Sequence, residues 1–375
     1  MQISKRSLYD YAIIGAGISG ACVAYFLKKS GKNVVVIEKD DIASGGSGAA
    51  GAFLSPKICS KSRYTSFIND SFSYAIKFYR ENFPEFLDEK GILRILRSED
   101  EIKKCRDLED FMPKDFRYLN SSEIDILNQN SCKFGGYFFS NGAVIDASGV
   151  ISQMIKDIDL LKPLHVEHLE MVDGVYNIGD IEAKGVIICA GASEDFEQIS
   201  YCGLKNIFGH RVDIETSTIV PFHLHKECSI SASRDGIVHV GATHIPNYKY
   251  DKSKDYTKEI DEMLEKAKSY IDFKEFSVKN IYFGARNSTQ DFFPVTGEVI
   301  DAKETLKKYP YIKKGTLVPR EKYLFHKNLY ICAGLGARGF VLAPKLASYL
   351  TQRICKETHI DKTIDTQRVF IRYVR

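Results

Sequence analysis

Three glycines near the N-terminus have the spacing of a turn that binds phosphate groups. They belong to the run Gly15-Ala16-Gly17-Ile18-Ser19-Gly20. In this spacing the first glycine permits a tight turn, the second lets the backbone approach a pyrophosphate, and the third packs a helix against a strand. Glu38 lies 18 residues after Gly20, where it can accept a hydrogen bond from a ribose hydroxyl, and Lys39 follows it. These residues predict a dinucleotide-binding site.

The elements around this turn are of the required type. Residues 10–14 form a short apolar run that is typical of a buried parallel strand. Residues 21–29 read as a helix, and Gly31 is placed to end it. Residues 34–37 form a second apolar run, which ends at Glu38. The sequence therefore predicts one complete β-α-β unit that carries the glycine turn.

Three later segments suggest that the chain returns to the same cofactor. The first is the small-residue loop Ser44-Gly45-Gly46-Ser47-Gly48-Ala49-Ala50-Gly51. The second is an apolar strand at 186–189 followed by Ala190-Gly191-Ala192. The third is an apolar strand at 329–333 followed by Gly334-Leu335-Gly336-Ala337-Arg338-Gly339-Phe340. A simple NAD domain would use consecutive β-α units, whereas repeated return to one extended cofactor favours FAD. The backbone N–H groups of such loops can stabilise negative charge on a reduced flavin.

The residues between these segments predict a second region with a different architecture. Helical spacing is found at 66–90, 149–157, 255–271 and 342–354, and a hairpin with an Asp173-Gly174 turn at 166–178. Alternating strands dominate 207–300, which is typical of antiparallel sheets. We expect an α/β fold with a discontinuous Rossmann-like FAD domain and a mixed, largely antiparallel substrate domain, the flavin ring lying at their junction. The FAD domain would use 1–80, 140–205 and 325–375, and the substrate domain 81–139 and 206–324.

The overall composition is that of an ordinary globular protein. Of the 375 residues, 44% are hydrophobic and 27% are charged, which excludes a disordered, collagenous or disulfide-scaffold protein. No run of 18 apolar residues exists, so we expect no membrane-spanning helix. Lys5 and Arg6 before an apolar stretch imitate a signal peptide, but the glycines within that stretch favour the β-α-β unit. The nine cysteines form no C-x-x-C pair, so we expect reduced thiols and a cytoplasmic location.

Three motifs resemble those of the FAD-dependent D-amino-acid oxidase (DAO) superfamily, which includes glycine oxidase and sarcosine oxidase. They are Gly46 to Pro56, Gly284-Ala285-Arg286 with residues 291–297, and Gly334 to Gly339 with Ala343-Pro344. More narrowly, the chain resembles the C-terminal FAD oxidase domain of the MnmC family of bifunctional tRNA-modifying proteins. Ala49 and Ala50 depart from this family, which often has larger polar residues there. The family's methyltransferase domain has no counterpart in this chain, so we expect no methylation activity.

The resemblance implies roles for particular residues. Arg286 aligns with a family arginine that clamps the substrate carboxylate, and a planar guanidinium suits such a bidentate contact. Arg338 lies in the last glycine loop, where it serves either the substrate or the flavin. Val166 matches a position whose backbone contacts adenine. No Cys or His occupies a flavin-linking position, so we expect noncovalent FAD and no metal. We expect His210, His239 and His244 to have structural roles, since hydride transfer needs no general base.

The distribution of charge leaves a partner open. Residues 303–375 carry +11 in a chain whose net charge is +3. Arg368, Arg372 and Arg375 have helical spacing and would form one basic face suited to tRNA phosphates, although a solvated basic surface explains the charge equally well.

Three functions therefore remain open. The first is oxidation of the carboxymethylaminomethyl group of the tRNA wobble uridine to aminomethyl-uridine and glyoxylate. The second is oxidation of a small amino acid such as glycine, sarcosine or a D-amino acid. The third is a flavin-binding subunit that has no activity alone. Neither the electron acceptor nor the oligomeric state can be read from the sequence.

Overall fold

The computed structural model describes residues 7–192, 196–314, 316–356 and 361–375. Lys5 and Arg6, whose charges imitate a signal peptide, lie outside these residues. The predicted β-α-β unit is present as β1 (Ser7–Ile14), α1 (Ile18–Lys29) and β2 (Val34–Ile37), and the two strands pair in parallel. Gly31 has a φ of 78°, and the N–H of Lys32 donates to the carbonyl of Leu27 at 3.1 Å. Gly31 therefore ends the helix, as predicted.

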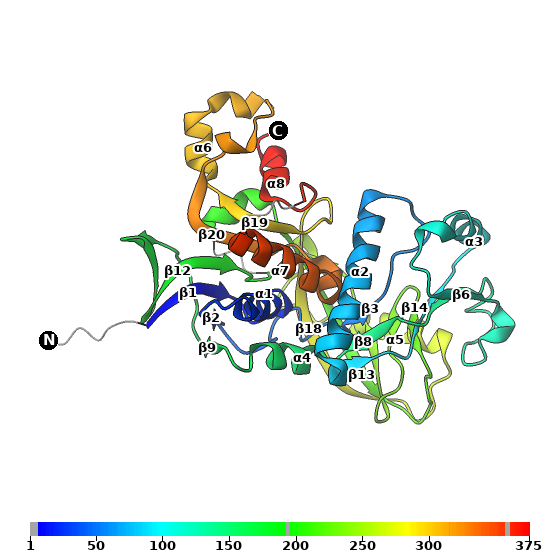
Figure 1. The fold of residues 1–375 in the computed structure, drawn as a ribbon. Coiled ribbons are helices and arrows are strands. Elements are labelled where there is room, and N and C mark those ends of the chain that lie inside the picture. The colour runs from blue at the N-terminus through cyan, green and yellow to red at the C-terminus, as the bar shows by residue number, and fades with distance from the viewer. Residues whose placement is uncertain (1–6, 193–195, 315, 357–360) are drawn as a thin grey trace.

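The first sheet has eight strands and is buried on both faces. Its order is β10-β11-β12-β1-β2-β9, with β20 on β12 and β19 on β20. Ile13 and Val36 belong to one hydrophobic cluster, and Ala12 and Ile37 to the other, which explains why these strands read as continuous apolar runs. Helices α1, α4 and α7 cover the first cluster, and α1 lies beside α7 (Figure 1). The elements not yet bounded are β9 (Asp159–Leu161), β10 (Met171–Val172), β11 (Val175–Ile178), β12 (Ile181–Ile188), β19 (Val295–Ile300), β20 (Phe325–Ala333), α4 (Ala147–Ile155) and α7 (Gly339–Lys356).

The second sheet has nine strands and is largely antiparallel. Its order is β17-β13-β16-β15-β14-β5-β7-β6, with β18 on β13, and only its β5–β14 pair is parallel. Helix α5 covers one face, and strands β14 and β6 of this sheet lie to the right of α2 in Figure 1. Its elements are β5 (Ile92–Ile95), β6 (Phe116–Leu119), β7 (Gly136–Phe139), β13 (Lys205–Glu215), β14 (His223–His225), β15 (Ser229–Ile230), β16 (Ile237–Gly241), β17 (Ile245–Pro246), β18 (Ser277–Ser288) and α5 (Thr257–Tyr270). The predicted α/β fold with a mixed second sheet is confirmed.

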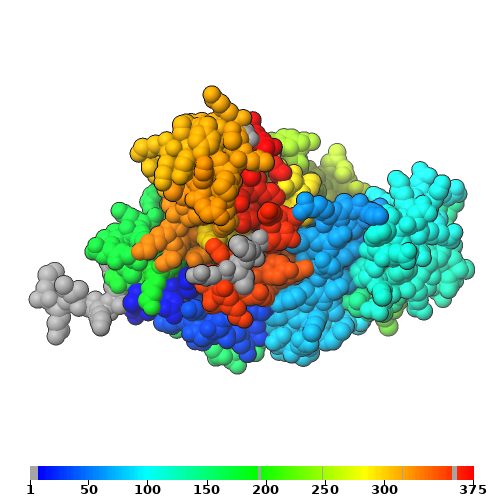
Figure 2. All heavy atoms as spheres, turned by 45° about the horizontal axis from the view of Figure 1, so that its top comes forward, coloured from blue at the N-terminus to red at the C-terminus, as the bar shows by residue number. Residues whose placement is uncertain are grey.

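The remaining elements surround these two sheets. Strands β3 (Phe53–Leu54), β4 (Leu87–Asp88) and β8 (Ala143–Ile145) form a small third sheet. The remaining helices are α2 (Arg63–Asn82), α3 (Glu99–Arg106), α6 (Ala302–Lys308) and α8 (Thr366–Tyr373). Figure 2 shows the α6 segment and the α3 segment at opposite sides of the molecule. Among the described residues, no helix combines the length and the apolar character that crossing a membrane requires.

Several predicted elements have different bounds in the structure, among them a helix and a hairpin. The helix expected at 66–90 begins earlier, where the Ser62 hydroxyl accepts the N–H of Thr65 at 3.1 Å, and it ends at Asn82. Pro84 disfavours helical backbone at Phe83, so the chain leaves the helix there and passes through the 3₁₀ turn Pro84–Phe86 into β4. The hairpin expected from residue 166 begins only at Met171, and its turn at Asp173-Gly174 is as predicted.

The expectation that every cysteine is a reduced thiol is wrong. Cys59, in the loop after β3, and Cys105, in α3, form a disulfide across 46 residues of sequence. No local pattern signals such a pair, because it depends on how the loop and the helix pack. The other seven cysteines are free, and all of them except Cys355 are buried.

Strand β19 belongs to the first sheet, although the predicted domain boundary assigns it to the substrate domain. The predicted boundary at 325 places residues 295–300 in the substrate domain, yet β19 hydrogen-bonds to β20 in the first sheet. We therefore propose that the FAD domain takes in β19 as well as 1–80, 140–205 and 325–375. The substrate domain would then be built from 81–139 and the rest of 206–324.

The C-terminal arginines do not form the predicted basic face. Arg368 makes an ion pair with Asp291 and donates to the carbonyls of Phe293 and Pro294 at 3.0 and 2.8 Å. Arg372 donates to the same Asp291 carboxylate at 2.7 Å, and Arg375 lies beyond the end of α8. Two of the three arginines thus hold α8 against the segment at 291–294 and are not a free basic face. Contact of this stretch with tRNA phosphates stays a prediction.

Replacing Arg368 by Ala should therefore destabilise the fold. We expect a loss of about 1–3 kcal/mol, because the substitution removes one of the two arginines that pair with Asp291 and the donor to the carbonyls of Phe293 and Pro294. Burial alone would raise the pKa of Asp291, but its hydrogen bonds to Arg372 and Arg368 hold it below 3.8. This stabilisation is present above pH 3.8 and is lost as Asp291 becomes protonated. The unfolding temperature of R368A should lie below that of wild type, and this difference should become smaller towards pH 3. R375A should unfold at the wild-type temperature.

Candidate active site

A cavity of about 600 Å³ lies between the two sheets. The ends of four strands of the first sheet reach it through Gly15, Glu38, Ala190 and Gly334. The second sheet contributes residues of β13, β14, β16 and β18. In open α/β sheets the carboxyl ends of the strands are where ligands bind. The position of this cavity therefore matches the predicted junction of flavin and substrate.

The glycine turn is built as the spacing predicts. Gly15 has a φ of 107°, and a Cβ atom there would lie 2.6 Å from the carbonyl oxygen of Cys189 in the neighbouring strand segment. A Cβ atom on Gly20 would lie 1.9 Å from the carbonyl oxygen of Gly15, so only glycine lets α1 pack this closely. The Glu38 carboxylate accepts the N–H groups of Ala16 and Asp40 at 2.7 and 3.0 Å, and it has further lone pairs for a ribose hydroxyl.

The small residues of the loop at 44–51 are required by its neighbours. A Cβ atom on Gly46 would lie 2.3 Å from the carbonyl oxygen of Ala285, and one on Gly284 would lie 2.7 Å from the Cβ atom of Ala49. The loop thus lies directly against β18, the strand that carries Arg286. The Ser47 hydroxyl accepts the N–H of Ile18 at 3.0 Å, which ties the loop to the start of α1.

Arg211 is a positioning residue that the sequence did not reveal. From β13 its guanidinium donates to the carbonyls of Gly48 and Ala50 and makes an ion pair with Asp213. These contacts fix the far end of the small-residue loop. Arg211 was not among the predicted site residues, since its role depends on the approach of a loop more than 160 residues away.

Arg286 is a cation without a counter-ion in this cavity. Its two Nη atoms lie 3.3 and 3.4 Å from the carbonyl oxygen of Thr243, and no carboxylate among the described residues pairs with it. Burial lowers its pKa, and burial followed by the charge of Arg286 lowers the pKa of His244. A guanidinium has five N–H donors, so most of those on Arg286 are left for a ligand. The arrangement suits a bound carboxylate.

Arg338 is a second cation of this kind. It lies in the short 3₁₀ turn Gly336–Arg338, and its Nη1 donates to the carbonyl of Ser55 at 2.8 Å. Burial lowers its pKa, and it has no carboxylate partner within the described chain. The cavity therefore has two arginines whose charge the protein does not neutralise.

Most of the predicted site residues line the cavity. They are Gly15, Gly17, Ile18, Ser19, Glu38, Lys39, Gly46, Ser47, Ala49, Ala50, Gly51, Ala190, Gly191, Arg286, Gly334, Leu335, Gly336, Ala337, Arg338, Gly339 and Phe340. Four predicted residues do not line it, namely Ala16, Gly20, Gly48 and Val166. The first three act through the contacts described above, and Val166 is buried in the hydrophobic cluster on the second face of the first sheet.

Several lining residues were missed or misjudged. His244, expected to be structural, lines the cavity beside Arg286. His225 and Glu227 also line it, and the sequence gave no motif around them. His210 and His239 do have structural partners, Thr243 at 3.0 Å and Asp213 at 2.6 Å. Among the described residues, no group of His, Cys, Asp and Glu is placed to hold a metal ion.

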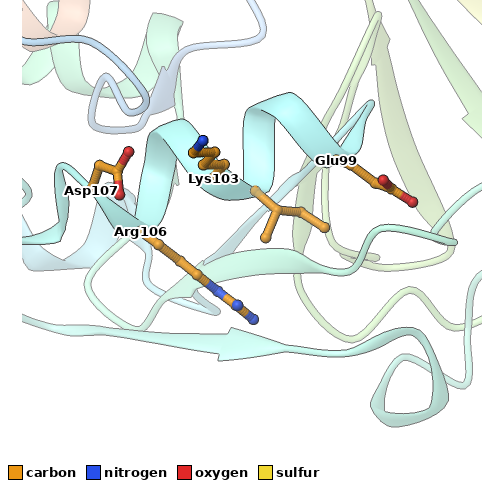
Figure 3. Close-up of a pocket in the computed structure, with 5 residues that line it drawn as sticks. Glu99, Lys103, Arg106 and Asp107 are labelled. Carbon is orange, nitrogen blue, oxygen red and sulfur yellow. The ribbon is translucent and has the colours of Figure 1, made fainter.

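A separate hollow lies beside α3 (Figure 3). It is lined by Glu99, Ile102, Lys103, Arg106 and Asp107, and none of these lines the larger cavity. Arg106 covers the ring of Tyr118 at 5.6 Å. Its charged side chains are those of a solvated helix face, so we assign no chemistry to it.

The chain belongs to the DAO family of FAD dependent oxidoreductases, whose model matches residues 10–353. It is therefore an FAD-dependent oxidoreductase, and the glycine turn and the cavity at the strand ends fit that cofactor. The bifunctional tRNA 5-methylaminomethyl-2-thiouridine biosynthesis protein MnmC of Legionella pneumophila (strain Corby) is 26% identical over 93% of this chain. MnmC of Campylobacter fetus is 25% identical over 100% of it. The chain spans 54% and 61% of these two relatives.

Solved structures share the fold over nearly the whole chain. Glycine oxidase from Bacillus cereus has a TM-score of 0.74 at 22% identity, covering 94% of this chain and 96% of the other. Glycine oxidase from Geobacillus kaustophilus has a TM-score of 0.75 at 19% identity with the same coverage. L-α-glycerophosphate oxidase from Mycoplasma pneumoniae, solved with FAD bound, has a TM-score of 0.69 at 15% identity, covering 93% and 95%. The glycine oxidase-like fold that the sequence predicted is thereby confirmed.

Proposed function

We propose that this enzyme oxidises a C–N bond next to a carboxylate, in the carboxymethylaminomethyl group of the tRNA wobble uridine. The observation that carries the proposal is Arg286, a cation without a counter-ion in the cavity that the FAD turn opens onto. The relatives named MnmC, which match more than nine-tenths of the chain, support the choice of tRNA over a free amino acid.

The chemistry follows from the charges around the cavity. FAD held by the lining residues would supply the hydride acceptor for the carbon between the amine and the carboxylate. Hydrolysis of the substrate imine by water would then give glyoxylate and aminomethyl-uridine. Arg286 would hold the carboxylate through two parallel N–H bonds. The positive charges of Arg286 and Arg338 lower the pKa of a bound ammonium group, which favours the neutral amine that can react. Burial, followed by the charge of Arg286, lowers the pKa of His244, which favours the neutral imidazole beside the substrate.

We further propose that the lining residues named above hold FAD noncovalently. Two cysteines lie at the cavity, but burial raises the pKa of Cys332 to about 11 and raises that of Cys189 well above 9. Since the thiolate is the nucleophile, neither thiol is activated for a bond to flavin. Denaturation in acid should release all of the FAD into the supernatant, and flavin that stays with the precipitate would contradict this.

The substrate also sets the expected location. Modification of tRNA places the enzyme in the cytoplasm, and we propose that location. Cytosolic proteins rarely keep disulfides, so the Cys59–Cys105 bond is the feature of this chain that fits the location least well.

Anaerobic reduction of the bound flavin tests the proposed substrate. The holoenzyme is mixed with tRNA that carries the carboxymethylaminomethyl group, with tRNA that lacks it, and with glycine, sarcosine and D-alanine. We expect bleaching of the flavin band near about 450 nm with the modified tRNA alone. Bleaching by a free amino acid but not by tRNA would make the protein a small-molecule amino-acid oxidase. An FAD-bound protein that no substrate bleaches would instead be a subunit that needs a partner.

A further inference from the structure

Four basic side chains gather at the end of the cavity that Ser55 lines. We refer to Lys57, Arg94, His225 and Arg338 as the basic cluster. Arg94 on β5 is paired directly with His225 on β14 in the parallel ladder, so their side chains lie on the same face of the sheet. Arg338 lies at the same end, where its Nη1 donates a hydrogen bond to the carbonyl of Ser55. Lys57 follows Ser55 by two residues. His225 and Arg338 line the cavity, whereas Lys57 and Arg94 are not among its lining residues and belong to the cluster through their closeness to Arg338.

The positive charges of this cluster are not neutralised within the described residues. The Nη1 atom of Arg94 is buried and has no hydrogen-bond partner there, and no carboxylate forms an ion pair with Lys57, Arg94 or Arg338. Two carboxylates lie near, but each has another partner. Glu101 makes its ion pair with Arg97, and its charge offsets only part of the effect of burial on the pKa of Arg94. Glu227, which lines the cavity, accepts the hydroxyl of Tyr270.

The cluster is unfavourable without a ligand. Burial and the neighbouring Arg338 lower the pKa of Arg94 to about 9. Burial, followed by Arg338 and Arg94, lowers the pKa of Lys57, and burial followed by the same two arginines lowers that of His225. Like charges placed together in a buried site cost stability unless an anion compensates them. This arrangement therefore points to an anion that binds here.

The cluster is distinct from the Arg286 site in the same cavity. Arg286 extends from β18, hydrogen-bonds to the Thr243 carbonyl and lowers the pKa of His244 by its charge. The cluster is instead built from β5, β14, the Ser55 segment and the turn at Arg338. The cavity thus offers two places for negative charge. A simple amino acid such as glycine has one carboxylate and leaves the second place unused.

We propose that the basic cluster binds a phosphate group of the substrate, next to the nucleoside whose carboxylate Arg286 holds. This inference rests on the proposed function. The guanidinium groups of Arg94 and Arg338 supply forked N–H donors that match phosphate oxygens. The ammonium group of Lys57 and the imidazole of His225 can supply further donors. The specificity for a nucleotide over a free amino acid would then come from this second contact.

Inorganic phosphate is the direct probe, because its binding does not depend on turnover. Titration calorimetry of the holoenzyme should detect phosphate binding to wild type, and R94M should weaken it at least tenfold. Arg94→Met replaces a buried charge by an apolar side chain of similar length, which cores often tolerate. R117M, at an exposed arginine on β6 of the same sheet, is the matched control and should bind phosphate as wild type does. If R94M loses its FAD, K57Q takes its place in the comparison.

Turnover then separates this inference from the proposed function. In flavin reduction, R94M should lose at least tenfold more kcat/KM with the modified uridine 5′-monophosphate than with the modified uridine nucleoside. Equal losses, or a wild-type holoenzyme that binds no phosphate, would overturn the phosphate subsite even if the nucleoside is oxidised. Failure of the modified tRNA to reduce wild type would overturn the proposed function, and the calorimetry would still decide whether the cluster binds phosphate.

Discussion

Replacing Arg286 by Ala should lower kcat/KM for flavin reduction about a thousandfold, while the protein stays folded and yellow. Truncating one partner of a buried charge pair costs about 2–5 kcal/mol, and each 1.4 kcal/mol is tenfold. The side chain contacts only the Thr243 carbonyl within the described protein, and it has no carboxylate that its loss would leave unpaired. The substitution should therefore affect the substrate rather than the fold. Stopped-flow reduction under anaerobic conditions measures the effect.

Arg286→Lys provides the matched comparison. It keeps the positive charge but loses the planar fork, so it should recover only part of the lost rate. The FAD content and the unfolding temperature of both variants should equal those of wild type. An R286A enzyme that reduces its flavin at the wild-type rate would show that the carboxylate is held elsewhere, and Arg338 would then be the next residue to replace.

The sequence was most informative where structure depends on neighbours in the chain. The β1-α1-β2 unit is one example, because its glycines, its apolar runs and Glu38 all lie within 38 residues. The turn at Asp173-Gly174 and the end of α1 at Gly31 are equally local. The small-residue loop at 44–51 could be recognised from its composition. Why the loop needs small residues was not visible in the sequence, because the cause is the close approach of β18, which lies more than 230 residues further along the chain.

The sequence was least informative about charges that meet only in the folded chain. Arg368 and Arg372 look like a basic helix face until Asp291 is placed between them. Arg94 is an unremarkable arginine in a short strand until β14 brings His225 beside it. The Cys59–Cys105 pair likewise joins a loop to a helix. In each case the partner is set by sheet order and helix packing, which local spacing does not encode.

The second large effect is expected at Gly20, where a single added methyl group should cost the protein its cofactor. Its Cβ atom would lie 1.9 Å from the carbonyl oxygen of Gly15, a backbone atom that cannot rotate away. Helix α1 would have to move off the turn, and with it the N-terminal N–H groups that face a pyrophosphate. Overpacking of this kind costs about 1–3 kcal/mol or more. We expect G20A to be purified largely without FAD and to need at least tenfold more added FAD for half-saturation.

A control at the other end of α1 separates cofactor binding from helix stability. A Cβ atom on Gly31 meets nothing within 4 Å, and Asn tolerates the left-handed backbone found there. Gly31→Asn should therefore keep a full complement of FAD and unfold within a few degrees of wild type. Absorbance of the purified proteins and titration with FAD give both quantities. If G20A binds FAD as tightly as Gly31→Asn does, the turn is not the pyrophosphate site, and the family's mode of cofactor binding would not hold for this chain.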